Sequence, residues 1–198
     1  MKMNSHSETE DNDIQTQPLA DVYVFLALTM RYPDTSFLAE DFFDVFEELL
    51  GSFDMSSEQE EIRTCRQQDN NLVDTLQVEY TRLFINAIPH IIAPPYGSFY
   101  LDGDHTLQGK STRRARDFYR QYGYDIADTS EPADHIRFEL EFLAALTRDN
   151  ELEAEEQFLK TIFRPWFISF YKRVLDDKGH PFYQVSLKLI DMFTKEEQ

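Results

Sequence analysis

Apolar residues recur at the spacing of an amphipathic helix through almost the whole of this 198-residue chain. The first such stripe begins at Leu19 and includes Val22, Leu26 and Met30, which share one face of a helix with 3.6 residues per turn. Similar stripes follow as far as Phe193, separated by prolines and glycines. No run alternates with the period of two that is typical of a half-buried strand. The pattern predicts an all-α protein of roughly eight to ten helices.

The chain length and the position of the breaks predict one helical domain made of two lobes. A chain of 198 residues can bury one substantial core, or two small lobes that share an interface. We expect a disordered acidic tail over residues 1–17, where apolar side chains are too few to offset the entropy of ordering. The helical domain should then span residues 18–198, with an N-terminal lobe over about 18–123, a hinge over about 124–131 and a C-terminal lobe over about 132–198. A hinge permits exchange of a lobe between copies, so both a monomer and a domain-swapped homodimer are compatible with the sequence.

The chain is strongly acidic, and this limits its partners. It has 37 acidic and 19 basic residues, a formal net charge of -18. A general binder of nucleic acid or of anionic membranes needs a cationic surface, so a basic partner is the better match. The single cysteine, Cys65, allows no intramolecular disulfide and is compatible with a reducing compartment. Because no segment resembles a secretory leader or a membrane span, we expect a cytoplasmic protein without stable membrane insertion.

The charges are unevenly distributed along the chain. Residues 34–61 carry ten acidic residues and no basic one. The basic residues gather instead at Lys110, Arg113, Arg114, Arg116 and Arg120, against the single acid Asp117. The simplest interpretation of the basic cluster is a helix that balances the acidic lobe within the same molecule.

Most motifs of enzyme chemistry are absent from the sequence. Residues Gly103–Ser111 resemble a phosphate-binding loop, but they place five residues between the two glycines where that motif needs four, and no predicted strand precedes them. Neither HExxH nor Gly-x-Ser-x-Gly occurs, nor do the paired Glu-x-x-His motifs of a di-iron bundle. We therefore expect no catalytic residues, no metal site and no cofactor.

One histidine has a suggestive setting. Asp134 precedes His135, and Glu139 follows four residues later on the same face of a predicted helix. Such a pair can orient a general base or a ligand. For an isolated Asp-His at a helix start, however, capping and local hydrogen bonding are the simpler expectation.

A segment rich in proline and aromatic residues interrupts the helical pattern over residues 85–103. It is too apolar for an ordinary linker, which is normally polar or disordered. Pro94 and Pro95 can fix an extended crossing between lobes, with Tyr96 and Tyr100 as packing anchors. The alternative is that the segment shapes a peptide-binding surface.

Several short motifs occur in a characteristic order. They are Tyr-Thr-Arg-Leu-Phe at 80–84, Pro-Pro-Tyr-Gly-Ser-Phe-Tyr at 94–100, and Glu-Pro-Ala-Asp-His at 131–135 leading into Glu-Leu-Glu-Phe-Leu at 139–143. Together they resemble the TorD/DmsD/NarJ family, the dedicated chaperones of molybdenum-cofactor enzymes. Gly-His-Pro-Phe-Tyr at 179–183 is similar to the DmsD branch in particular.

This resemblance implies a function as well as a fold. It implies a cytoplasmic chaperone that binds the twin-arginine signal peptide, the apo form, or both, of a molybdenum-cofactor oxidoreductase subunit until the cofactor is inserted and the subunit is exported. Two alternatives stay open. One is a NarJ-type assembly factor for an enzyme that is not exported, and the other is a protein that binds GTP weakly through Gly103–Ser111, with weak hydrolase activity.

The resemblance also indicates where a leader peptide would bind. Apolar side chains would line a groove for the leader. Asp134 or Glu139 would accept hydrogen bonds from its guanidinium groups, and His135 would help to orient those groups. The predicted peptide-binding residues are Tyr80, Leu83, Phe84, Pro94, Pro95, Tyr96, Ser98, Tyr100, Asp134, His135 and Glu139.

Overall fold

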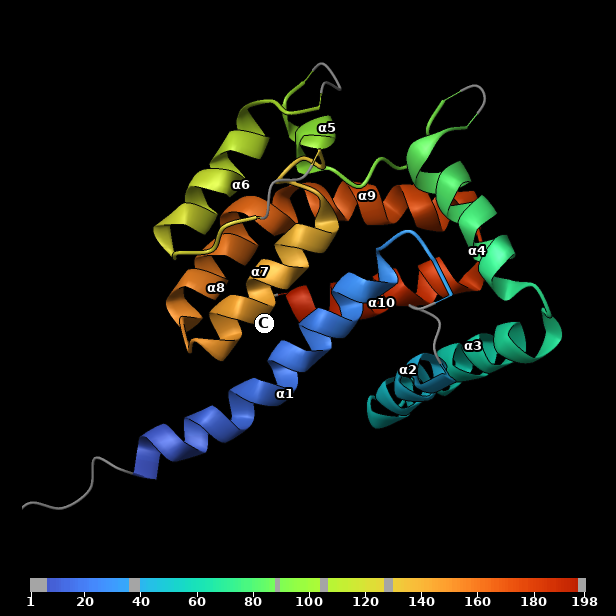
Figure 1. The fold of residues 1–198 in the computed structure, drawn as a ribbon, viewed down its shortest axis with the longest axis horizontal. Coiled ribbons are helices and arrows are strands. Elements are labelled where there is room, and N and C mark those ends of the chain that lie inside the picture. Colours follow the sequence, from blue (N-terminus) through green and yellow to red (C-terminus); the bar gives the residue numbers. More distant parts are fainter. Residues whose placement is uncertain (1–6, 36–39, 88–89, 104–106, 127–129, 196–198) are drawn as a thin grey trace, which may run out of the picture. The chain divides into compact units, whose positions relative to one another are not determined.

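Helices form all the regular secondary structure in this computed structural model, which describes residues 7–35, 40–87, 90–103, 107–126 and 130–195 (Figure 1). The α-helices are α1 (Ser7–Thr29), α2 (Glu40–Ser52), α3 (Ser56–Gln68), α4 (Leu72–Tyr80), α5 (Gly97–Leu101), α6 (Lys110–Gln121), α7 (Ile136–Arg148), α8 (Leu152–Phe158), α9 (Arg164–Asp177) and α10 (Pro181–Thr194), and the π-helical segments are η1 (Thr81–Ile85) and η2 (Leu159–Phe163). No strand occurs among the described residues, which confirms the all-α prediction. None of the described helices combines the length and the apolar character needed to span a membrane.

The helices group into two compact units that differ from the predicted lobes. Unit 1 comprises residues 1–30, 95–168 and 194–198, and unit 2 comprises residues 31–94 and 169–193. The expected hinge at about 124–131 falls inside unit 1, with residues 127–129 outside the described part of the chain. The reason is that unit 1 brings together helices far apart in sequence, and local periodicity does not encode that pairing.

Unit 1 is built on the pairing of α1 with α7, which run along each other in Figure 1. A buried hydrogen-bond triad fastens α1 to this unit. The Tyr23 hydroxyl donates to Glu155 Oε1 over 3.0 Å, and the Thr147 hydroxyl donates to Glu155 Oε2 over 3.1 Å. Beside the triad, the rings of Phe142 and Phe158 pack edge to face with centroids 5.0 Å apart.

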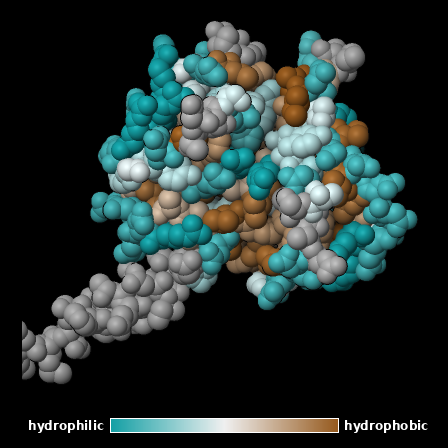
Figure 2. Space-filling model, viewed as in Figure 1, coloured by the Kyte–Doolittle hydropathy of each residue, from teal (hydrophilic) through white to brown (hydrophobic). Residues whose placement is uncertain are grey.

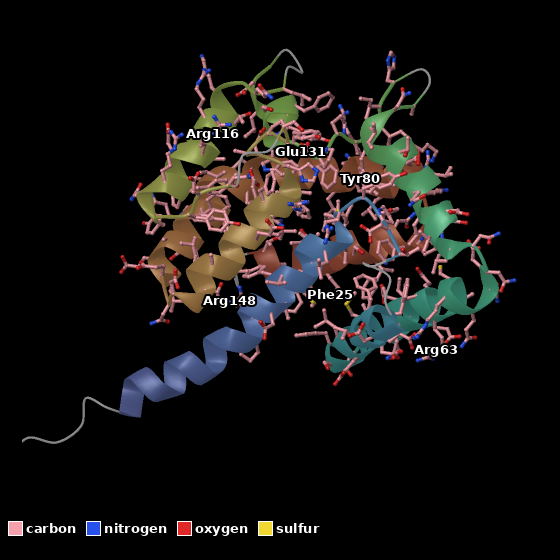
Figure 3. All side chains as sticks on the ribbon, in the orientation of Figure 1. Phe25, Arg63, Tyr80, Arg116, Glu131 and Arg148 are labelled. Atoms are coloured by element: carbon pink, nitrogen blue, oxygen red, sulfur yellow. The ribbon has the colours of Figure 1, made fainter. Side chains whose placement is uncertain are left out.

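Unit 2 contains the α2–α3 hairpin, visible in Figure 1. Its apolar stripe meets α10, where the buried Phe182 contacts the rings of Phe42, Phe43 and Phe46 at centroid distances of 5.8 to 6.2 Å. On the outer side, Arg63 of α3 pairs with Glu47 of α2 at 3.1 Å (Arg63 is labelled in Figure 3). The aromatic stripe of Phe42, Phe43 and Phe46 is therefore the core face of α2.

Two helix boundaries differ from the sequence expectation. The helix expected to begin at Leu19 begins at Ser7, so residues 7–17 belong to α1 and Pro18 lies inside it, while residues 1–6 are outside the described residues. The stripe that starts at Leu72 changes from α-helix to π-helix at Thr81. Apolar periodicity does not distinguish a short π-helical segment from the α-helix that it continues.

Candidate functional site

Two of the sequence motifs meet in unit 1 through an isolated antiparallel bridge. Tyr96 pairs with His135. The backbone N–H of Ile136 donates to the carbonyl of Pro95, and that of Gly97 donates to the carbonyl of Asp134, each over 3.0 Å. The proline-rich segment is therefore fastened to the start of α7 by its own backbone.

Asp134 and His135 brace this junction from the inside. Asp134 is 1% exposed, and its Oδ2 accepts a hydrogen bond from the backbone N–H of the buried Ser98 over 2.6 Å. His135 caps α7, since its Nδ1 accepts from the backbone N–H of Arg137 over 3.1 Å. Burial, and to a lesser extent the charge of Arg137, lowers the pKa of His135 to about 3, so the ring is neutral at physiological pH. The capping expected from the sequence is confirmed.

Glu139 lies deeper in the same unit. It is fully buried, and the indole N–H of Trp166 donates to its Oε2 over 2.9 Å. Burial, reinforced by the nearby Asp134, raises the pKa of Glu139 well above its usual range. Tyr100 stacks on Trp166 with ring centroids 5.7 Å apart. An enclosed carboxyl group that accepts the Trp166 indole N–H is a structural element rather than an exposed acceptor for an arginine.

The side chain of Tyr96 extends from this junction toward the surface. The Tyr96 ring meets that of His135 edge to face at 5.1 Å, and its hydroxyl donates to the carboxylate of Glu131, which Figure 3 labels. Tyr96 and Glu131 are both half-buried. Tyr100 is also half-buried, whereas Pro95 is buried with Asp134, His135 and Glu139.

The other two motifs meet in unit 2. Tyr80, Leu83 and Phe84 are buried, at 6%, 0% and 2% exposed. Tyr183 from the Gly-His-Pro-Phe-Tyr motif packs its ring against those of Tyr80 and Phe84, at 6.1 and 5.3 Å. Its hydroxyl donates to the carbonyl of Leu76 over 2.9 Å. Pro94, at the end of this unit, is buried as well.

The opposite face of the same segment is charged and half-buried. Glu79 Oε2 accepts from Arg82 Nε over 2.7 Å, and Arg82 Nη1 also donates to Asp177 Oδ1 over 3.2 Å. Glu79 Oε1 accepts the backbone N–H of His180 over 2.8 Å. Burial by itself would raise the pKa of Glu79, but the hydrogen bonds from Arg82 and His180 outweigh it, so the pKa is lowered. Glu79 is therefore ionised at neutral pH.

An open cleft of about 760 Å³ lies over this charged face. Its lining consists of Asn71, Asp74, Thr75, Val78, Glu79, Arg82, Lys178, Gly179 and His180. Val78 is 69% exposed, and Ile85, farther along the same segment, is 51% exposed. Figure 2 shows hydrophobic surface over the segment that Figure 1 labels α4. This cleft combines two carboxylates, two cationic side chains and one exposed apolar side chain, Val78, and its size is enough to hold a segment of a peptide.

The predicted residues of this segment and the residues of the cleft lie on different faces of it. Tyr80, Leu83 and Phe84 contact the core, whereas Asp74, Val78 and Glu79 line the cleft. The cleft residues lie off the apolar stripe, and no local pattern in the sequence indicates that Lys178–His180 would lie beside them.

In the segment that resembles a phosphate-binding loop, the carboxylate of Asp102 binds the backbone at the start of α6. Asp102 Oδ2 accepts the backbone N–H of Ser111 over 3.1 Å, and Asp102 Oδ1 accepts the Ser111 hydroxyl over 2.7 Å. A Cβ on Gly109 would lie 2.0 Å from Asp102 Oδ2. A carboxylate thus occupies the place where the loop of a nucleotide-binding protein presents its amides to phosphate, which argues against the nucleotide alternative. Residues 104–106 are outside the described part of the chain.

Comparison with known proteins gives consistent matches. The profile of the family described as nitrate reductase delta subunit matches residues 50–172. The Tat proofreading chaperone DmsD of Salmonella typhimurium is 37% identical over 115 residues, 56% of this chain and 54% of that protein. The chaperone protein TorD of Vibrio vulnificus is 30% identical over 142 residues, 63% of this chain and 66% of that protein. The matched regions thus span about half to two thirds of the length of these relatives.

A solved structure shares the fold. The crystal structure of a proposed redox enzyme maturation protein from Archaeoglobus fulgidus has a TM-score of 0.59 and 27% sequence identity, with 98% of each chain covered. The helical fold and its paired motifs place the protein in the class of redox enzyme maturation proteins. The chain belongs to the TorD/DmsD/NarJ family, as its motifs indicated.

Proposed function

We propose that this protein is a cytoplasmic, non-catalytic chaperone that binds the twin-arginine leader of a molybdenum-cofactor oxidoreductase subunit in the cleft of unit 2. The single observation that carries this proposal is the cleft itself, where the carboxylates of Asp74 and Glu79 lie on α4 together with the exposed side chain of Val78. Family membership supports the class of client, because the relatives include a Tat proofreading chaperone.

The chemistry of the cleft matches that of such a leader, which has an Arg-Arg pair followed by an apolar run. Asp74 is exposed and forms no ion pair within the described residues, so it is available to a guanidinium group. Val78 offers apolar surface to the residues that follow, and Ile85, outside the lining of the cleft, is the next large exposed apolar side chain along the segment. Burying an apolar side chain contributes about 1.5 to 3 kcal/mol, and the ordering of a flexible peptide offsets much of this. Micromolar binding, about -8 kcal/mol, is the expected range.

The motif pair in unit 1 contributes differently under this proposal. Asp134, His135 and Glu139 hold the junction of the proline-rich segment together from the inside. Tyr96 and Tyr100, which are half-buried, remain proposed leader contacts.

Calorimetry with a synthetic twin-arginine leader tests the proposal. Val78→Asn should weaken binding about tenfold, because it removes roughly 1.5 kcal/mol of apolar contact. Asp74→Asn should weaken it about threefold, as expected for one exposed ion pair. Val45→Asn and Asp41→Asn on α2 are matched controls, since both positions are exposed and outside the cleft. The proposal is wrong if the cleft variants bind as the wild type does, or if no binding occurs at tens of micromolar.

A second candidate is an assembly factor of the NarJ type, whose target is never exported. The match to the nitrate reductase delta subunit profile favours it. Such a factor should bind the mature catalytic subunit equally well whether or not an isolated leader peptide is present. Displacement of the mature subunit by micromolar leader would favour the leader-binding chaperone. An affinity for the mature subunit that the leader does not change would favour the assembly factor.

A further inference from the structure

Helix α6 in unit 1 presents a basic face in an otherwise acidic chain. The face consists of Lys110, Arg113, Arg114, Arg116 and Arg120, all exposed, with one acidic residue, Asp117, among them. The other side of α6 packs inward through the buried Thr112, Ala115 and Tyr119. Figure 3 shows Arg116 on the outer side of α6, and Figure 2 shows a hydrophilic surface over this helix.

Most of the basic face lacks an internal partner. Within the described residues, Lys110, Arg113, Arg114 and Arg116 form no ion pair, and Arg120 approaches only its helix neighbour Asp117, at 3.9 Å. Most of the other arginines in the described residues form ion pairs, as with Arg63 and Glu47 at 3.1 Å or Arg148 and Asp21 at 3.4 Å. The chain has 37 acidic residues for 19 basic ones, so a shortage of acids does not explain the difference.

The position of these basic residues also destabilises the helix that carries them. The first turn of α6 has basic and no acidic residues, although the partial positive charge of a helix N-terminus favours acidic side chains there. Asp102 offsets this unfavourable field by accepting the N–H and the hydroxyl of Ser111. A local arrangement that works against folding points to a use outside folding.

We propose that the basic face of α6 binds a carboxylate-rich segment of another protein. Guanidinium groups pair with carboxylates through two parallel hydrogen bonds, which suits a face built mainly of arginine. The helix is about 18 Å long at 1.5 Å per residue, so a short acidic segment covers it. A long polyanion such as nucleic acid, or an anionic membrane, fits less well, because the rest of the chain, with its net charge of -18, would repel it.

This surface is separate from leader binding. A twin-arginine leader is cationic and has no affinity for a row of arginines, so the basic face must serve a different partner or a different part of the client. The inference does not rest on the proposed function, because it depends only on the charges and ion pairs of unit 1.

Fluorescence anisotropy with a labelled octaglutamate peptide at 50 mM salt tests the inference on the full chain. The triple variant Arg113→Gln, Arg114→Gln, Arg116→Gln should bind the peptide at least tenfold more weakly than the wild type. A control with the same change of charge replaces the exposed Lys160, Lys172 and Lys195 by glutamine, and its affinity should stay within about twofold. Raising the salt to 500 mM should abolish binding in the wild type.

Several results would overturn the inference. Equal affinity of the two triple variants for octaglutamate would show that only overall charge matters. If the basic face binds a 20-nucleotide single strand or phosphatidylglycerol vesicles more tightly than octaglutamate, it belongs to another class of partner. Self-association of the wild type that the arginine variant abolishes would make a second copy the occupant. Circular dichroism of both variants controls for helix content, which glutamine supports.

Discussion

The backbone N–H of His180 donates a hydrogen bond to Glu79 Oε1 over 2.8 Å, and this bond joins two motifs that are far apart in the sequence. Gly179 makes the approach possible, since a Cβ there would lie 2.5 Å from the same oxygen. Arg82 completes the arrangement from the other side of the Glu79 carboxylate, with 2.7 Å between Nε and Oε2. The charged lining of the cleft is therefore fixed by contacts within unit 2 before any ligand is present.

Glu79→Gln should destabilise the protein by about 1 to 2 kcal/mol at pH 7, because it removes charge-assisted hydrogen bonds. The folded-state pKa of Glu79 is lowered, so its contribution is present above the ordinary carboxyl pKa and is lost as the pH falls through the folded-state value. Urea unfolding at pH 7 and pH 4 measures this, and the difference between variant and wild type should shrink at pH 4. Glu48→Gln on the exposed side of α2 is the control.

Glu139→Gln should show the opposite dependence on pH. Since burial raises the pKa of Glu139, the folded state retains a proton that the unfolded state releases, and wild-type stability falls as the pH rises above the ordinary carboxyl pKa. Glutamine removes this dependence while its oxygen still accepts the Trp166 N–H. We expect a gain of about 1 kcal/mol or more at pH 7 that diminishes toward pH 4. The same gain at both pH values would contradict the assignment; the exposed Glu156→Gln is the comparison.

His135→Ala should cost about 1 kcal/mol of stability through loss of the α7 cap, and His135→Asn should recover most of it. The pKa of His135 is lowered to about 3, so the unfolded chain takes up a proton first as the pH falls from about 6.5, and wild-type stability decreases over that range. His135→Asn should lack this part of the pH dependence. Thermal unfolding of the three proteins at pH 7 and pH 5 provides the measurement.

Gly97→Ala should destabilise unit 1 by about 1 to 3 kcal/mol, as is typical when a methyl group is forced into a packed core. The added Cβ would lie 3.1 Å from Cδ1 of the fully buried Trp166, which has little room to move. Gly51→Ala in α2 is the matched control, because its Cβ would meet only the amide end of the Gln59 side chain, at 3.0 Å, and that end can shift at the cost of its 2.8 Å hydrogen bond to the Glu47 carbonyl. Alanine favours a helix over glycine, so that variant should be neutral or slightly stabilised. If Gly97→Ala and Gly51→Ala change the free energy of unfolding equally in denaturant titrations, the cause is not steric.

Much of the fold was predictable from local pattern. The apolar residues of α4 and α7 recur at helical spacing, as expected for helices that pack on one face. The composition of the two units was not predictable. It depends on which helices pair, and the pairing of α1 with α7 joins residues more than one hundred positions apart, as between Asp21 and Arg148 (Arg148 is labelled in Figure 3).

The candidate site shows a related limit. Tyr80, Leu83 and Phe84 belong to the stripe that identified their helix, and the residues that form such a stripe are those that the core buries. The same side chains do not both fill a core and line an open groove. Asp74 and Val78 carry no such signal, since a single exposed acid or valine is ordinary on a helix surface. Capping by His135 was predictable because it depends on neighbours in the sequence alone.

Hydrogen exchange of the full chain, with and without a saturating twin-arginine leader, tests the central claim most directly. Binding in the unit 2 cleft predicts slower amide exchange over residues 71–85 and 178–180, and no protection when the arginine pair of the leader is replaced by glutamine. Protection confined to residues 95–140, with exchange in 71–85 and 178–180 unchanged, would contradict the account.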